Sequence, residues 1–223
     1  MKILLVAATE AEISPLLETL TLIRDDGKQL RNCLFKNLNA DVLITGVGMT
    51  NTAFYLGKYL SSGYDFALNL GLAGSFSENL ELGTVVNIIQ DHFSELGAED
   101  GEAFIAMDQL NLGTGSEVLN LSVMPHDALA LIPGVCGITV NTVHGREGTI
   151  TDVFNRLHPN TESMEGAAFL LACREEHIPC AQLRAISNYV ERRNRANWNI
   201  PLAIKNLNEK ALEIIKAFET ETR

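Results

Sequence analysis

Two glutamates in this sequence stand where a carboxylate can serve a small-molecule site. Glu12 follows the apolar run 3–8 and begins a predicted helix, and Glu165 precedes the small and apolar stretch 166–169. A glutamate in the first turn of a helix is often only a partner for the helix dipole, so two interpretations of Glu12 stay open. A charge at the head of a buried helix needs a compensating partner, and this favours a functional role for Glu165.

An amide and two glycine-rich turns add to these carboxylates. Asn188 ends a strongly apolar run, where its side chain offers an acceptor and two donors at one point; its alternative role is to cap the following helix. In the turn 70–75, Ala73 and Gly74 leave room for a flat ring against the backbone, although the turn can equally be a simple connection. The turn 46–51 lacks the third glycine of the dinucleotide fingerprint, which argues against a dinucleotide-dependent oxidoreductase.

Short β-branched runs alternate with helical patterns along the chain. The predicted strands are 3–8, 41–45, 66–70, 85–90, 137–142 and 182–186, and the predicted helices are 12–22, 51–61, 166–177 and 202–218. This alternation predicts a single α/β domain over residues 1–223, with three layers and a mixed, mostly parallel central sheet flanked by helices. In open α/β sheets, ligands bind beyond the carboxyl ends of the strands, and the segments that follow these strands carry the residues named above.

Charge and composition narrow the class of partner. The net charge of −11 over 223 residues argues against nucleic acid or an anionic membrane. The apolar start leads straight into an acidic segment without a cleavage pattern, so we expect a first buried strand and a cytoplasmic protein rather than a signal peptide. Without close metal-ligand spacing, the cysteines are expected to be reduced and mostly buried thiols: Cys33, Cys136, Cys173 and Cys180.

Together these segments resemble the nucleoside phosphorylase and nucleosidase superfamily, in its branch of methylthioadenosine/S-adenosylhomocysteine nucleosidases. The resemblance spans nearly the whole chain. Its most specific pieces are 163–168 (SMEGAA) and 184–188 (RAISN), with support from 9–12, 46–48 and 69–74. It implies an N-glycosidase that acts on a purine nucleoside without a cofactor or a metal, and a homodimer or larger homo-oligomer in which a neighbour's loop closes the pocket.

The resemblance also assigns roles to the two glutamates. Glu12 would activate the attacking water, and a positioned general base is typically worth about 10²–10⁴ in rate. Met164 and Glu165 would hold the ribose, with the Glu165 carboxylate on its 2′- and 3′-hydroxyls. That negative charge would also lie near the positive charge that develops on the sugar ring in the transition state.

The base and the 5′ side of the substrate follow from the same resemblance. Asn188 stands where the methylthioadenosine enzymes carry Asp; an amide can donate to a 6-oxo group and accept from a protonated N7, which suits hypoxanthine better than adenine. The loop with His144 and Gly145 would lie along the base beside Ala73 and Gly74, although His144 is as readily a hydrogen-bonded structural residue. Trp198 and three neighbouring arginines (Arg192, Arg193 and Arg195) would meet the 5′ group.

A narrower resemblance, to the futalosine hydrolases of this branch, rests on 187–194 (SNYVERRN) and 198–204 (WNIPLAI). It implies hydrolysis of futalosine to hypoxanthine and dehypoxanthine futalosine, in the alternative pathway of menaquinone biosynthesis. Asn69 and Leu72 stand where related phosphorylases anchor phosphate with Arg and Ser, so water is the expected nucleophile. Two alternatives stay open: a methylthioadenosine/S-adenosylhomocysteine nucleosidase that tolerates Asn188, and a non-catalytic nucleoside-binding module on the same fold.

Overall fold

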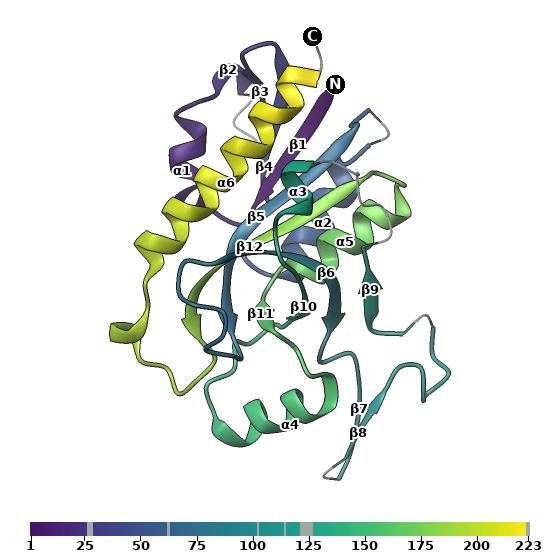
Figure 1. Ribbon diagram of the computed structural model, residues 1–223. Coiled ribbons are helices and arrows are strands. Elements are labelled where there is room, and N and C mark those ends of the chain that lie inside the picture. The colour runs from purple at the N-terminus through teal and green to yellow at the C-terminus, as the bar shows by residue number, and fades with distance from the viewer. Residues whose placement is uncertain (26–28, 62, 102, 114, 121–126, 222–223) are drawn as a thin grey trace.

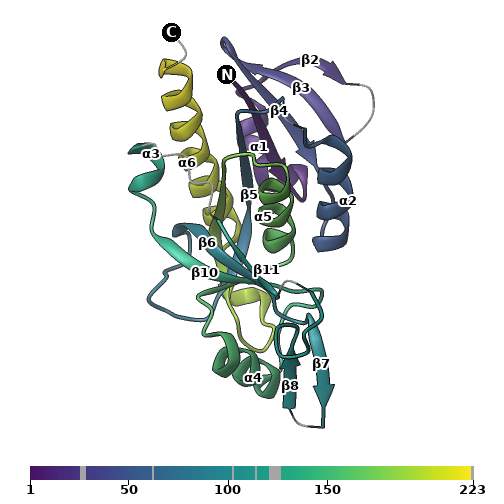
Figure 2. The ribbon, with the colours of Figure 1, turned by 90° about the vertical axis from the view of Figure 1, so that its right-hand side faces the viewer.

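The computed structural model describes residues 1–25, 29–61, 63–101, 103–113, 115–120 and 127–221. Helices lie on both faces of one large sheet (Figures 1 and 2). α1 (Glu10–Leu17) and α6 (Ile200–Glu221) pack together on one face, and α2 (Met49–Tyr59) and α5 (Gly166–Glu175) pack together on the other. The predicted three layers are therefore confirmed, with α3 (Asp127–Ala130) and α4 (Glu147–Leu157) as smaller additions.

Ten strands of the described residues form the main sheet, in the order β11-β10-β6-β12-β5-β1-β4-β3-β2 with β9 beside β6. The strands that build the site are β1, β5, β11 and β12, and a separate hairpin is formed by β7 and β8. Their bounds are β1 (Lys2–Ala7), β2 (Thr21–Asp25), β3 (Leu30–Phe35), β4 (Leu38–Ile44), β5 (Phe66–Ser75), β6 (Val85–Phe93), β7 (Gly97–Asp100), β8 (Ala103–Ala106), β9 (Glu117–Leu119), β10 (Gly134–Thr139), β11 (Thr161–Ser163) and β12 (Cys180–Tyr189).

The sheet is mixed, and the prediction that it is mostly parallel is wrong. β1–β4, β1–β5, β10–β11, β6–β10 and β5–β12 are parallel, whereas β5–β11, β6–β12, β2–β3, β3–β4 and β6–β9 are antiparallel. Four of the five antiparallel pairs involve strands that were not predicted from the sequence (β2, β3, β9 and β11), and the fifth, β6–β12, joins two predicted strands in an unpredicted direction. The pairing of β11 with β5 closes β5, β11, β10, β6 and β12 into a ring, so the sheet is partly a barrel.

The first helix is shorter than predicted. α1 ends at Leu17. Of the residues predicted to continue it, 18–20 form a turn and the last two begin β2, which pairs with β3. Thr21 and Ile23 are β-branched residues, which suit a strand, and the pairing with β3 gives the backbone of this segment hydrogen-bond partners. The other predicted helices and all six predicted strands are confirmed, with ends shifted by a few residues.

Apolar strands explain the core. β1 and β5 are buried on both faces, as strands covered by helices on either side must be. The two largest clusters of buried apolar side chains lie beneath α1 and α6 and beneath α2 and α5, respectively. In the part of the chain that the structure describes, no helix is both long and apolar enough to cross a membrane.

Candidate active site

Glu12 lies at the carboxyl end of β1, in the first turn of α1. Its Oε2 accepts hydrogen bonds from the backbone N–H and the hydroxyl of Thr9, each at 2.9 Å, which makes a capping box at the helix start. Its Oε1 accepts from the backbone N–H of Leu72 on β5 at 3.3 Å. The structure thus fixes the carboxylate between two neighbouring strands, so Glu12 is more than a partner for the helix dipole.

Glu165 lies at the N-terminal end of α5 and is 8% exposed. Its Oε1 accepts a hydrogen bond of 2.9 Å from the backbone N–H of Gly48, the residue that begins α2. The turn 46–51 therefore has a role in this site: it brings the positive end of a helix to a buried carboxylate. The prediction that Glu165 has a compensating partner is confirmed in this contact.

Arg184 on β12 joins the two glutamates electrostatically. Its side chain is fully buried, and its charge acts on Glu12 and Glu165. A methyl group added to Gly71 would lie 3.2 Å from the Arg184 Nη1 and 3.3 Å from the Glu12 Oε1, so these two atoms approach the same point above the strand. Glycine at this position leaves that space open between a cation and a carboxylate.

Burial shifts the protonation of these acids. It raises the pKa of Glu12 above its ordinary value, and the nearby negative charge of Glu165 raises it further, against the opposing effects of Thr9 and Arg184. Burial also raises the pKa of Asp91 to about 6, although Gln182 and Thr139 donate hydrogen bonds to it. Such shifted acids around one cation are typical of functional sites.

Asn188 lies near the carboxyl end of β12, the strand that also carries Arg184, and is paired with Gly74 on β5. Its Nδ2 donates to the carbonyl of Tyr189 at 2.9 Å, and its Oδ1 accepts from the hydroxyl of Ser187 at 2.8 Å, which fixes the orientation of the amide. One N–H and one lone pair of the amide stay free for a ligand. A side chain at Gly74 would meet the Nδ2 at 3.1 Å, so only glycine leaves room over β5 here.

A cavity of about 190 Å³ is lined by five of the predicted binding residues: Gly74, His144, Gly145, Asn188 and Trp198. The rest of its lining is Val143, Glu162, Tyr189, Val190, Glu191 and Arg193. Two larger hollows, of about 270 Å³ between α1 and α6 and about 450 Å³ beside the turn 46–51, are lined by none of the predicted side chains. The smaller cavity is therefore the better candidate for a ligand, because polar groups converge on it.

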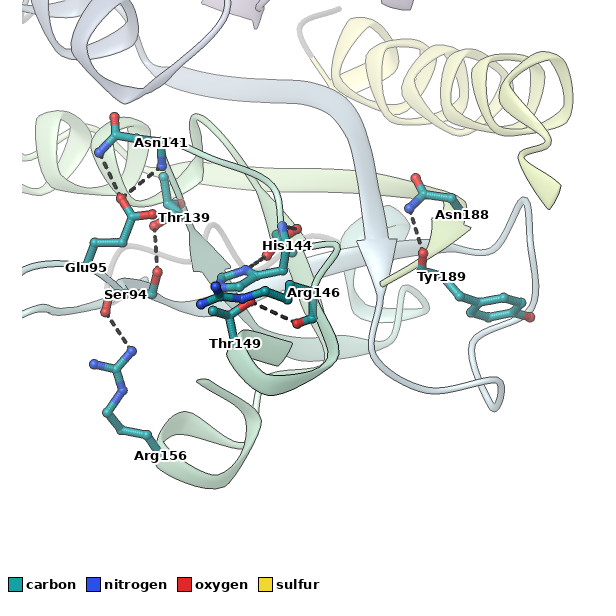
Figure 3. A network of polar contacts seen from close by, with 11 residues as sticks. Ser94, Glu95, Thr139, Asn141, His144, Arg146, Thr149, Arg156, Asn188 and Tyr189 are labelled. Carbon is teal, nitrogen blue, oxygen red and sulfur yellow. Dashed lines mark hydrogen bonds and ion pairs between the residues drawn. The ribbon is translucent and has the colours of Figure 1, made fainter. Parts of the chain in front are cut away.

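His144 is a hydrogen-bonded structural residue, which is one of the two roles that the sequence left open; its contact with the base stays a prediction. Its backbone N–H donates to the Glu162 Oε1 at 2.9 Å, and its Nδ1 is paired with the Glu162 Oε2. It also lines the cavity, and it lies on the opposite side of the end of β5 from Asn188 (Figure 3). Figure 3 also shows the hydrogen bonds that the backbone N–H and the Nδ2 of Asn141 donate to Glu95, at the start of the loop that leads from β10 to His144.

Ala73 and Met164, like Glu12 and Glu165, are predicted site residues that do not line this cavity, whereas Trp198 does. Ala73 is buried on β5, and its carbonyl accepts from Ser187. Met164 packs against Ile138, Val140 and Val153, between the cavity strand β11 and Glu165. Trp198 follows the short 3₁₀ helix η1 (Arg195–Asn197), with the Arg193 guanidinium 5.0 Å from its ring centre.

Two residues of this site were not identified from sequence. Arg184 gave a signal, because an arginine inside the apolar run 182–186 needs buried partners. The sequence signal for Glu162 was weaker, because its hydrogen-bond partner His144 lies 18 residues away and nothing in the spacing indicates that the two meet. The four cysteines are free, and three of them are buried.

Comparisons with known proteins bear on this geometry. A model of the phosphorylase superfamily matches residues 2–219. The futalosine hydrolase of Acidothermus cellulolyticus is 30% identical over 177 residues, which cover 75% of this chain and 72% of that protein. Two solved structures share the fold. The native futalosine hydrolase of Helicobacter pylori strain 26695 gives a TM-score of 0.77 at 18% identity, covering 99% of this chain and 98% of that one. The 5′-methylthioadenosine/S-adenosylhomocysteine nucleosidase of Campylobacter jejuni gives 0.79 at 21% identity, covering 99% of each.

Proposed function

This chain belongs to the phosphorylase superfamily, and we propose that it hydrolyses the N-glycosidic bond of futalosine and releases hypoxanthine. The observation that carries the proposal is the fixed amide of Asn188, held over Gly74 with one donor and one acceptor free. The relative at 30% identity is named for the same reaction. The pathway that this name implies is menaquinone biosynthesis by way of futalosine.

The chemistry assigned to Glu12 is activation of water. Three of the roughly four lone-pair positions of its carboxylate are occupied by Thr9 and Leu72, which leaves one on Oε1. In the proposed step, the water oxygen bonds to C1′ and a water proton passes to Glu12, while the bond from C1′ to the base breaks. The base leaves with the electron pair of that bond and takes up a proton at N7 from solvent. Glu165 and Met164 would hold the ribose, with the Glu165 charge near the sugar ring as it becomes positive.

Asn188 would read one edge of the leaving base. Its free N–H would donate to the 6-oxo group, and its carbonyl would accept from N7 once that nitrogen is protonated. A 6-amino group in the same place would present a donor to a donor, and an unmade hydrogen bond in a buried site costs about 1–3 kcal/mol. A nucleosidase selective for methylthioadenosine would therefore fit this amide poorly.

Phosphate should have no effect on base release. The Leu72 backbone N–H is bonded to Glu12, and the Asn69 side chain donates to the carbonyl of Val6, so neither is presented to an anion. Incubation of the protein with futalosine, with and without phosphate, should release hypoxanthine at equal rates and yield a free sugar. A sugar phosphate that increases with added phosphate would instead make the chain a phosphorylase. No release of base at all would favour a nucleoside-binding module.

The 5′ side of futalosine carries an aromatic carboxylate, and we assign it to Trp198 and Arg193. Of the three arginines in this segment, Arg193 lines the cavity, while Arg192 and Arg195 are not part of that lining. Its guanidinium already stacks on the Trp198 ring. A carboxylate beside the Arg193 guanidinium would gain a charged hydrogen bond of about 1.5–3 kcal/mol.

Trp198→Ala should therefore lower specificity for futalosine much more than for inosine, which lacks the aromatic 5′ group. Stacking of about 0.5–1.5 kcal/mol, together with the loosened arginine contact, predicts a loss of about tenfold to a hundredfold in kcat/KM for futalosine. Cleavage of inosine, slow already, should change little. An equal loss for both nucleosides would show that Trp198 only packs the loop.

We further propose that residues 1–223 act as one domain, that the protein is cytoplasmic, and that it works as a homodimer or larger assembly. Four free thiols support a reducing compartment. Exposed apolar side chains such as Val47 and Phe54 on and beside α2 support a contact between subunits.

A further inference from the structure

We propose that Glu162, held in place by His144, binds the edge of the purine that carries N1 and so selects a 6-oxopurine. The inference deepens the proposed function and rests on it. Asn188 would bind N7 and the 6-oxo group, and Glu162 would bind N1, which lies on the other side of the 6-oxo group from N7. The proposed function assigns roles to Glu12, Glu165 and Asn188, and it assigns none to the carboxylate of Glu162.

The sheet places the two side chains on either side of one glycine. Gly74 on β5 is directly paired with Asn188 on β12 and with Glu162 on β11. Residues directly opposite one another on neighbouring strands have side chains on the same face. Neighbouring strands are about 4.8 Å apart, so the two backbones are roughly 10 Å apart. With no side chain at Gly74, the space between them is of the right order for a flat bicyclic base.

The contacts of Glu162 leave it able to bind a donor. Its side chain is only 4% exposed, yet it lines the cavity. Both of its described hydrogen bonds come from one residue, the backbone N–H and the Nδ1 of His144. In the proposed arrangement the His144 Nδ1 carries the hydrogen and donates it to the Glu162 carboxylate. Two of about four lone-pair positions therefore stay available to a ligand.

The chemistry of the two bases makes this contact selective. Hypoxanthine carries a hydrogen on N1, which donates to a carboxylate. Adenine carries a lone pair on N1, which would face the negative charge of Glu162. A site built to bond a donor rejects the analogue that lacks it, because the buried carboxylate is then left unpaired. His144 is a positioning residue, since it holds the carboxylate and does not itself need to touch the base.

Glu162→Gln tests this assignment, because the Gln amide removes the charge and can turn an N–H toward N1. The measured quantity is the ratio of kcat/KM for futalosine to kcat/KM for its 6-amino analogue. We expect that ratio to fall about tenfold to a hundredfold. His144→Ala should also lower it, whereas His144→Asn, which keeps a donor near the position of Nδ1, should largely restore it. Inhibition by free hypoxanthine and free adenine gives a second readout that needs no turnover.

Glu95→Gln is the matched control. Glu95 also holds the loop before His144, through the backbone and side chain of Asn141, but it does not line the cavity. It should leave the ratio unchanged. If Glu162→Gln keeps the wild-type ratio and the wild-type preference for hypoxanthine as inhibitor, the inference is wrong while the proposed function stands. If the wild-type protein does not cleave futalosine, the proposed function itself fails.

Discussion

Glu12→Gln should lower kcat by about 10²–10⁴-fold, with substrate affinity largely retained. The substitution is unusually clean, because a capping box accepts Gln in place of Glu. The hydrogen bonds with Thr9 that start α1 can therefore persist while the proton acceptor is lost. Single-turnover rates and KM for futalosine would separate this loss of chemistry from a loss of binding.

The pH profile gives the same experiment a second readout. Burial and the charge of Glu165 raise the pKa of Glu12 above its ordinary value of 4.5. The base must be ionised to accept a proton, so activity should rise with pH through this raised pKa and level off above it. Glu12→Gln should abolish that acidic limb in the residual activity.

Glu165→Gln is the comparison variant. Because we place Glu165 on the ribose hydroxyls, this change should raise KM as well as lower kcat, unlike the change at Glu12. The contact with Gly48 is lost or weakened at the same time. Near-normal turnover in both variants would remove the catalytic assignment of the two carboxylates.

Arg184→Met should lower kcat at neutral pH by about tenfold to a thousandfold. A preorganised charge or donor in a buried site is typically worth this much. Arg184 is the cation that acts on both Glu12 and Glu165, and it lowers the pKa of Glu12. Without it, two buried carboxylates repel each other with less compensation, so Glu12 keeps its proton to a higher pH.

The diagnostic result is the acidic limb of kcat against pH, which should move to higher pH in Arg184→Met because the cation that lowers the pKa of Glu12 is lost. Arg184→Lys keeps the charge and should move the limb less, which also serves if the Met variant folds poorly. Arg174→Met removes a partly buried arginine that pairs with the exposed Glu175 on α5; it is the control and should leave the limb in place. An unmoved limb in both Arg184 variants would mean that Arg184 only fills space.

The fold could be predicted from the sequence where hydrophobic patterns are long. The runs around β1, β5 and β12 are mostly apolar, with Arg184 the one charged residue among them after Lys2, and helices α2, α5 and α6 have clear apolar faces. The parts that were missed are short or exposed. β2 is exposed along its whole length, so no buried face distinguishes it from the end of α1. β11 has only three residues, yet it changes the sheet from open to partly closed.

The site could be predicted where a motif carries it and not where tertiary contact creates it. Glu12, Glu165 and Asn188 follow strands, and the structure brings all three to the same end of β5. Glu162 matters because of its register with Gly74 and its contact with His144, and neither can be read from spacing along the chain. Arg184 was visible as a charge in an apolar strand, but the acids around it lie on three other segments.

The ring of strands also governs when in folding an active molecule first exists. Its closure joins residue 74 to residue 162, two points far apart along the chain, and joining distant segments is entropically costly and slow. The edge for the base forms only at this step, because Gly74 is flanked by Asn188 and Glu162 together only in the closed ring. Chains in which β11 has not yet paired with β5 should therefore have no nucleosidase activity. Any nucleoside or base that fits between the two side chains binds only the finished molecule and so shifts the folding equilibrium toward it.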